Sequence, residues 1–173
     1  MTDLLVSYSW GRFDRARSEI VRILTKFGDP DPSVERTAVR GIAIAHTALD
    51  NREVIRQCWR LWQSERPDSF EFAVKWVPVD FWCETDLEAM KQIIDTRIEG
   101  RLEQGQTWGM KVRKRGWQRY HSCEIVEFLA AGIDAKVDLS NPDWILWVDV
   151  IGRRTAISLL RPQEIFSLGL PHL

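Results

Sequence analysis

The sequence predicts an α+β protein with two domains, one over residues 1–82 and one over residues 84–173. Two observations support this prediction. Apolar residues recur along the chain with either the two-residue period of strands or the 3.6-residue period of helices. A capping-box pattern at Thr85 then starts a new helix, directly after a segment that contains the turn-forming residues Pro78 and Asp80. We therefore expect a domain boundary near residue 83.

The first half begins with a strand, a helix and a hairpin. Residues 4–8 form a short apolar run, and residues 13–27 carry apolar side chains at helical spacing up to Gly28, a residue that suits the end of a helix. Residues 33–47 are rich in β-favouring side chains on both sides of Gly41, which predicts two antiparallel strands.

A second helix and a fourth strand complete this half. Asp50 and Glu53 form an acidic variant of a capping box before a helix that should end near Pro67. Phe70, Phe72, Val74 and Trp76 alternate with other residues and predict a half-buried strand. The order βαββαβ is that of a ferredoxin-like domain.

The second half predicts the order αβαβββ. Helices are expected over residues 85–102 and from Ser122 to Gly132, with a strand over 108–113 between them. A short strand at 136–139, a long apolar strand at 144–151 and a return strand at 155–160 follow, the last two joined by a tight turn at Gly152-Arg153.

A basic segment stands out in a chain whose net charge is only −1. Five cations occur between residues 111 and 119 with no acid among them: Lys111, Arg113, Lys114, Arg115 and Arg119. The strand should turn Met110 and Val112 inward and the cations outward, and the loop leads into the N-terminus of a helix, where backbone N–H groups favour anions. Trp117 and Tyr120 offer surfaces for base stacking. RNA binding and an ordinary solvated face both remain open on these grounds.

No motif for catalysis or for a cofactor is found. The chain lacks GxxxxGK[ST] and GxGxxG, its carboxylates fall at helix caps and surfaces, and His46, His121 and His172 lack metal-ligand spacing. We expect no catalytic residue, no metal and no cofactor. The cysteines Cys58, Cys83 and Cys123 form no CxxC pair and are interpreted as small buried apolar residues.

The sequence also lacks an apolar run of the ~20 residues that cross a bilayer and begins without a signal-peptide pattern. A cytoplasmic protein without membrane contact is the expectation.

Three segments carry a family resemblance. They are the basic strand at 111–115, the helix start at 122–125, and the run Lys136-Val137-Asp138-Leu139 with its Ser140-Asn141-Pro142-Asp143 turn, followed by an apolar strand from Trp144. Together they resemble a THUMP domain over about residues 85–161. In this family a ferredoxin-like domain precedes the THUMP domain, which agrees with the βαββαβ order of residues 1–82.

The resemblance implies a tRNA-binding module. THUMP domains are usually fused to a modifying enzyme, and this chain has no room for one, so it is similar to the stand-alone adaptor that assists tRNA cytidine acetylation. The implied partners are tRNA, through its acceptor stem and 3′ end, and a separate acetyltransferase. The resemblance assigns RNA contacts to one set of residues: Lys111, Arg113, Lys114, Arg115, Arg119, His121, Ser122, Lys136, Arg153 and Arg154. Ser122 would cap the helix, and a plain hairpin tip is the preferred explanation of Arg153 and Arg154.

Two other functions compete with the adaptor. One is a detached RNA-binding subunit of a thiouridine synthetase or tRNA methyltransferase, and the other is a protein-interaction scaffold that uses some of the nine tryptophans as hot spots. Arg12 and Arg15 on the first helix serve as comparison cations, because a binding site at the basic segment predicts that their reversal matters less.

Overall fold

The computed structural model describes residues 1–64 and 69–169. These form two compact units. Unit 1 comprises residues 1–79 and the C-terminal segment that begins at Gln163, and unit 2 comprises Asp80–Pro162. The division differs from the expected domain limits, because the junction lies at Val79 and the C-terminal segment joins unit 1 instead of unit 2. The reason is β10 (Phe166–Ser167), which follows a 3₁₀ turn (Pro162–Glu164) and pairs with a strand of unit 1.

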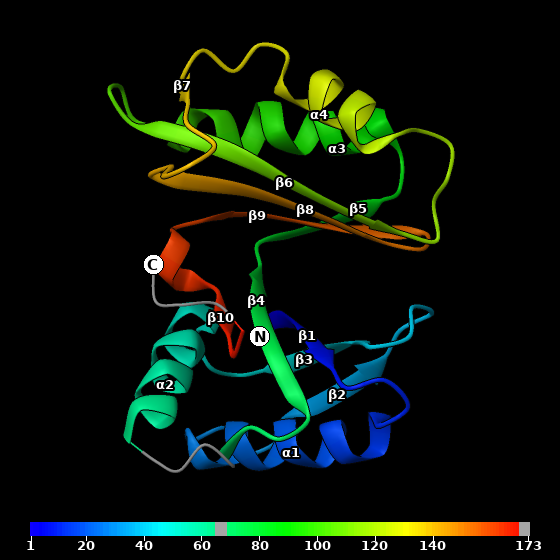
Figure 1. Cartoon of the computed structure of the whole chain (residues 1–173), viewed down its shortest axis with the longest axis vertical. Coiled ribbons are helices and arrows are strands. Elements are labelled where there is room, and N and C mark those ends of the chain that lie inside the picture. Colours follow the sequence, from blue (N-terminus) through cyan, green and yellow to red (C-terminus); the bar gives the residue numbers. More distant parts are fainter. Residues whose placement is uncertain (65–68, 170–173) are drawn as a thin grey trace. The chain divides into compact units, whose positions relative to one another are not determined.

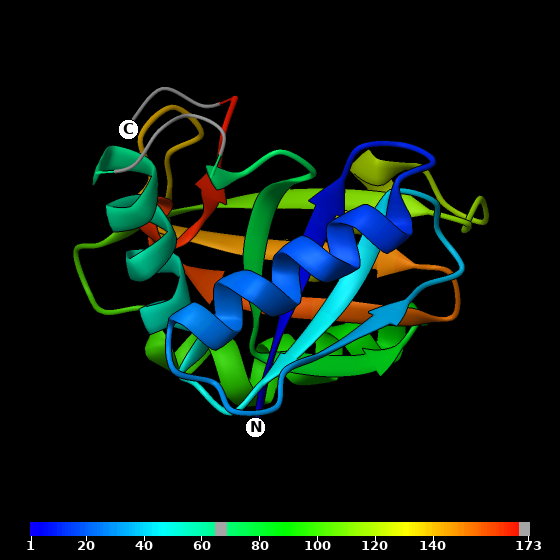
Figure 2. The ribbon, with the colours of Figure 1, turned by 90° about the horizontal axis from the view of Figure 1, so that it is seen from below.

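Unit 1 has the predicted βαββαβ order before β10 is added. Its elements are β1 (Thr2–Tyr8), α1 (Phe13–Lys26), β2 (Ser33–Arg36), β3 (Ile42–Thr47), α2 (Asn51–Ser64) and β4 (Ala73–Val79). The sheet order is β10-β4-β1-β3-β2, with antiparallel neighbours throughout. Helices α1 and α2 pack on one face of this sheet (Figure 2). The ferredoxin-like assignment of this unit stays a prediction.

The helix ends of unit 1 follow the sequence signals. Asp50 Oδ1 accepts the backbone N–H of Glu53 at 2.9 Å and caps α2. Gly28 ends α1 with a φ of 107°, a backbone conformation that glycine adopts without steric cost. The expected end of α2 near Pro67 lies outside the described residues.

The fourth strand is shifted along the chain from its expected place. It was predicted over residues 70–76, but β4 begins at Ala73 and continues through Pro78. Glu19 explains the start, because its buried carboxylate accepts the backbone N–H groups of Glu71, Phe72 and Ala73 at 2.7, 3.0 and 2.6 Å. Pro78 is tolerated because β10 pairs with β4 only at Trp76 and Lys75, so no ladder bond on that side calls for an N–H at residue 78.

His46 on β3 lies between two carboxylates and should make stability depend on pH. Its Nδ1 is 2.7 Å from Asp3 Oδ1 and its Nε2 is 3.1 Å from Glu35 Oε2. Burial lowers the pKa of His46, but the hydrogen bonds and charges of Asp3 and Glu35 outweigh it, so the pKa is raised overall. The stabilisation is therefore complete below the unfolded pKa of about 6.5 and is lost as pH rises through the folded pKa.

We expect the Tm of the wild type to fall between pH 6 and pH 8.5 by more than the Tm of His46→Gln falls. Thermal unfolding followed by circular dichroism at both pH values measures this difference. Equal falls in the two proteins would contradict the assignment.

Unit 2 is a mixed sheet with two helices on one face (Figure 1). Its elements are β5 (Phe81–Glu84), α3 (Leu87–Ile93), a π-helical turn (Ile94–Ile98), a 3₁₀ turn (Glu99–Arg101), β6 (Thr107–Arg115), α4 (Ser122–Ala130), β7 (Lys136–Val137), β8 (Trp144–Ile151) and β9 (Arg154–Leu160). The sheet order is β5-β9-β8-β6-β7, and β6 runs parallel to both of its neighbours. The αβαβββ order from α3 onward is as predicted.

Two details of unit 2 correct the sequence analysis. Strand β5 was not predicted, because a domain boundary was expected at this place; its short run pairs with β9 and places Phe81 and Cys83 against the core. Asp86 and not Thr85 caps α3, since Asp86 Oδ2 accepts the backbone N–H of Ala89 at 3.0 Å. The hydroxyl of Thr85 instead shares a hydrogen bond with that of Thr155.

Candidate nucleic-acid interface

Strand β6 presents one apolar and one basic side, as the alternation predicted. Met110 and Val112 pack against the core of unit 2, whereas Lys111 and Arg113 are exposed. Within residues 1–64 and 69–169, neither cation forms an ion pair with a carboxylate. The Arg113 guanidinium lies 5.6 Å from the centre of the Trp147 ring, a contact that leaves its charge available. Both side chains are therefore placed to meet a phosphate.

Arg115 has a partner inside the protein. Its Nη1 donates to Oδ1 of Asp149 at 2.9 Å, and the Asp149 side chain is only 5% exposed. Asp149 also accepts the indole N–H of Trp147 at 3.3 Å. A buried carboxylate needs such partners, because burial of an unpaired charge is costly. The position of Arg115 therefore fits a structural ion pair better than a phosphate contact.

Lys114 and the two aromatic residues of the following loop also point toward the protein. Lys114 Nζ donates to the carbonyl of Tyr120 at 2.7 Å. Trp117 and Tyr120 are half-buried, pack on the core of unit 2 and contact each other edge to face at 5.4 Å. Their partial burial reduces the ring surface open to a base, and base stacking on them stays a prediction. Arg119 remains exposed and lies over the Tyr120 ring at 5.4 Å.

The N-terminus of α4 differs from its expected form. Ser122 was predicted to cap the helix, but His121 occupies the cap position with extended backbone, and Ser122 is the first helical residue. The carboxylate of Glu124 accepts the backbone N–H of His121 at 2.7 Å and closes the first turn. His121, Ser122 and Cys123 are all exposed, so the interpretation of Cys123 as a buried apolar residue is wrong, whereas that of Cys58 is confirmed.

The two remaining groups of predicted residues lie at opposite ends of β6. The turn at Gly152 is beside Arg115, because the Gly152 N–H donates to the Arg115 carbonyl at 2.9 Å. Exposed Arg153 thus lies near the carboxyl end of the strand, and Arg154 contacts the Trp82 ring at 4.9 Å. Lys136 pairs with Thr107 at the other end, about 25 Å away at ~3.3 Å per residue. The predicted residues are therefore not one continuous patch.

The turn after β7 is a structural element. Asp138 Oδ1 accepts the backbone N–H groups of Asn141 and Ser140 at 3.0 and 2.9 Å, and these bonds, with the nearby Lys136 charge, lower the pKa of Asp138. A Cβ at Gly109 would meet the Asp138 carbonyl oxygen at 3.2 Å, so this turn packs directly on β6. The view of Asn141-Pro142 as a turn-former agrees with this geometry.

The sequence analysis missed a second cluster of cations, which lies in unit 1. Arg12 and Arg15, chosen as comparison cations, line a cavity of about 400 Å³ together with Arg36 and Arg40. The hydrogen bond from the Tyr8 N–H to the Gly41 carbonyl at 2.9 Å brings the two parts of the chain together. The sequence does show arginines beside Trp10-Gly11 and beside Gly41. These two segments become neighbours only when the strands pair.

Other kinds of site were searched for in the described part of the chain. Among those residues, no group of three or more His, Cys, Asp and Glu side chains is arranged to hold a metal ion. None of the helices described has the length and apolar character to cross a membrane.

Comparisons with known proteins identify relatives of the fold. No family model matches the chain. The uncharacterized protein MJ0421 of Methanocaldococcus jannaschii is 31% identical over 93 residues, which are 51% of this chain and 25% of that protein. The crystal structure of PH1313 from Pyrococcus horikoshii OT3 matches 96% of this chain and 55% of its own, with a TM-score of 0.63 and 16% identity. A 4-thiouridine synthetase, crystallised with RNA and ATP, matches 96% of this chain and 42% of its own, with a TM-score of 0.53 and 16% identity.

These likenesses concern the fold. The chain has a THUMP-like α+β fold, which confirms the coarser part of the resemblance found in the sequence. The chain spans a quarter of the curated relative and about half of the structures that it matches.

Proposed function

We propose that the chain is a tRNA-binding adaptor that presents tRNA to a separate modifying enzyme, a tRNA cytidine acetyltransferase. The single observation that carries the RNA-binding part is the exposed pair Lys111 and Arg113 on β6, two cations without carboxylate partners among the described residues, on a strand whose other side is anchored in the core. Arg119 and Arg153, both exposed, extend this charge beyond the carboxyl end of β6. Phosphate recognition rests on such cations.

The structural likeness supports an RNA-related role. A 4-thiouridine synthetase with the same fold over 96% of this chain was crystallised in complex with RNA. We infer that this chain uses the shared fold to hold tRNA and that the chemistry resides in another catalytic unit. The proposal includes that this chain itself does not catalyse tRNA modification.

The experiment has a binding arm and a chemical arm. Purified protein is titrated with a tRNA and with the same tRNA lacking its unpaired 3′ nucleotides, and binding is followed by fluorescence anisotropy. We expect tighter binding of the intact tRNA. In the chemical arm, protein and tRNA are incubated with acetyl-CoA, S-adenosylmethionine or ATP, and no modified nucleoside should appear by mass spectrometry. Failure to bind tRNA would refute the adaptor, and a modified nucleoside would refute the non-catalytic role.

The second candidate is an RNA-binding subunit for a thiouridine synthetase, which the likeness to the 4-thiouridine synthetase favours. Adding the acetyltransferase or the catalytic part of a thiouridine synthetase to the binding reaction separates the two. The true partner should gain activity on tRNA in the presence of this chain, and a chain with Lys111→Glu and Arg113→Glu should not provide that gain.

A further inference from the structure

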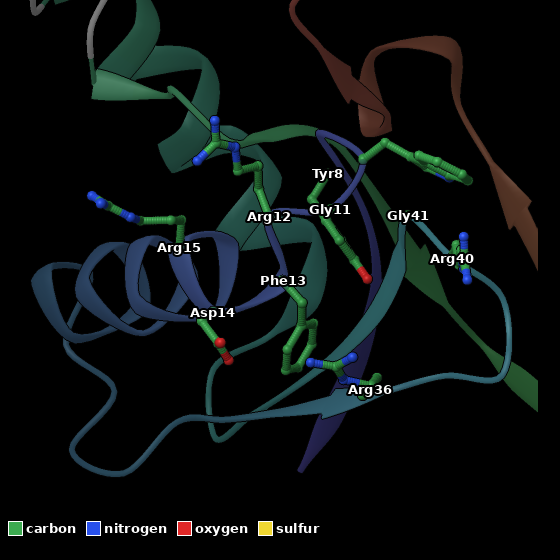
Figure 3. A pocket seen from close by; sticks show the side chains of 10 residues that line it. Tyr8, Gly11, Arg12, Phe13, Asp14, Arg15, Arg36, Arg40 and Gly41 are labelled. Carbon is green, nitrogen blue, oxygen red and sulfur yellow. The ribbon is translucent and has the colours of Figure 1, made fainter.

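Unit 1 contains a cavity whose composition suits a phosphorylated ligand. It lies where β1 leads into α1 and is bordered by the loop between β2 and β3, and its volume is about 400 Å³ (Figure 3). Four arginines and one aspartate line it, a formal charge of +3 in a chain whose net charge is −1. We call this cavity the arginine pocket, and its cations are Arg12, Arg15, Arg36 and Arg40.

The four cations are not used to balance acids of the protein. Within residues 1–64 and 69–169, none of these guanidinium groups forms an ion pair with a carboxylate. Like charges gathered in one place repel one another, and a bound anion relieves this repulsion. Guanidinium groups also bind phosphate through paired, charge-assisted hydrogen bonds. The charge of the pocket therefore selects an anion, with phosphate geometry as the best match.

Aromatic side chains supply the second half of the recognition. Tyr8 and Phe13 meet edge to face at 5.8 Å in the pocket wall, and Arg36 lies over the Phe13 ring at 4.3 Å (Figure 3). Trp10 is 71% exposed, and the Arg40 guanidinium lies 5.0 Å from its ring centre. An exposed indole beside a phosphate-binding cation offers a planar surface on which a nucleobase can stack.

The helix start adds to this arrangement. Arg12 is at the cap position of α1, and its side chain forms no capping hydrogen bond to the first turn. Residues at this position usually accept a backbone N–H, but arginine has no acceptor, so the Arg12 side chain does not cap the first N–H groups of α1, and a helix start favours anions. The helix start thus favours the same kind of ligand, an anion, as the arginines that line the cavity.

We propose that the arginine pocket binds one phosphate-bearing nucleotide, with its phosphate held by Arg36 and Arg40 and its base on Trp10. Such a nucleotide can be free in solution or can be an unpaired nucleotide of an RNA strand. The cavity volume is in the range of known small-ligand sites. The pocket shares no residue with the β6 cations, so the inference does not depend on the proposed function.

Isothermal titration of the full chain at low salt tests the proposal, with four probes: AMP, adenosine, inorganic phosphate and a five-nucleotide oligoadenylate. AMP should bind more tightly than adenosine or inorganic phosphate. Oligoadenylate that binds more tightly than AMP identifies RNA as the source, and equal or weaker binding identifies the free nucleotide. Absence of AMP binding at millimolar concentration, or equal affinities for AMP and inorganic phosphate, would overturn the proposal.

Matched variants locate the site. Arg36→Gln with Arg40→Gln should weaken AMP binding by about tenfold or more, since two charge-assisted contacts are lost. Arg17→Gln with Arg60→Gln, which changes two exposed arginines outside the pocket, should leave it unchanged. Trp10→Ala removes an exposed ring without touching the core, and it should weaken AMP binding but not phosphate binding. An AMP affinity that Trp10→Ala does not change, or that falls equally in both double variants, would place AMP elsewhere.

Discussion

Reversal of the two exposed β6 cations, Lys111→Glu with Arg113→Glu, should reduce tRNA affinity by on the order of 10- to 100-fold at ~0.15 M salt. Both side chains are exposed, so the change removes two phosphate contacts and adds two repulsive charges while Met110 and Val112 on the core side stay unchanged. Arg113→Glu also removes the contact with the Trp147 ring. Each lost contact should also lower the slope of log affinity against log salt by about 0.7–0.9. Fluorescence anisotropy over a series of salt concentrations measures both quantities.

The control must carry the same change of charge at residues outside both candidate binding sites. Arg12 and Arg15 are unsuitable because they line the arginine pocket. Arg17→Glu with Arg60→Glu changes exposed residues of α1 and α2 instead, and among the described residues it disrupts only the solvent-exposed ion pair of Arg60 with Glu53 at 3.8 Å. If this control weakens binding as much as the β6 variant, net charge and not a local site governs the affinity. If the β6 variant binds normally, Lys111 and Arg113 are not RNA contacts.

Periodicity predicted most of the fold because each half has long, regular segments. The alternation of Met110 and Val112 with Lys111 and Arg113 indicated both the strand and its two sides, and Asp50 and Gly28 marked helix ends correctly. Local patterns could not predict elements that depend on distant partners. Strand β5 exists because β9 offers it a free edge, and the start of β4 depends on the Glu19 carboxylate, 52 residues away from Glu71.

The candidate site was harder to predict for the same reason. The sequence does not reveal whether a cation faces solvent or a buried acid. Arg115, and not Arg113, forms the ion pair with Asp149, and this difference arises only after β6 and β8 have paired. The arginine pocket likewise requires residues from both ends of the loop between β2 and β3, from the end of β1 and from the start of α1. Exposure of Arg113 and burial of Asp149 are thus properties of the sheet and not of the basic segment.

The ion pair of Arg115 leads to the second large effect, which is on folding. Arg115→Met should lower the free energy of unfolding by about 2–3 kcal/mol, because the nearly buried Asp149 carboxylate loses a charged partner at 2.9 Å. Urea unfolding followed by circular dichroism measures this loss. Arg115→Met with Asp149→Asn should recover much of it, because the amide carries no charge and can still accept the Trp147 N–H, 3.3 Å from Oδ2 in the wild type.

RNA binding by the same variant tests the alternative role of Arg115. If Arg115 acts through Asp149 alone, folded Arg115→Met should bind tRNA within about threefold of the wild type. No phosphate contact is lost in that case, and only one positive charge is removed. The β6 variant at Lys111 and Arg113 should bind tRNA weakly. It should also lose some stability, because Arg113→Glu places a carboxylate on β6 directly opposite the nearly buried Asp149 on β8. An Arg115→Met protein of normal stability that has lost tRNA affinity would show that Arg115 serves RNA and that Asp149 is satisfied by its other partners.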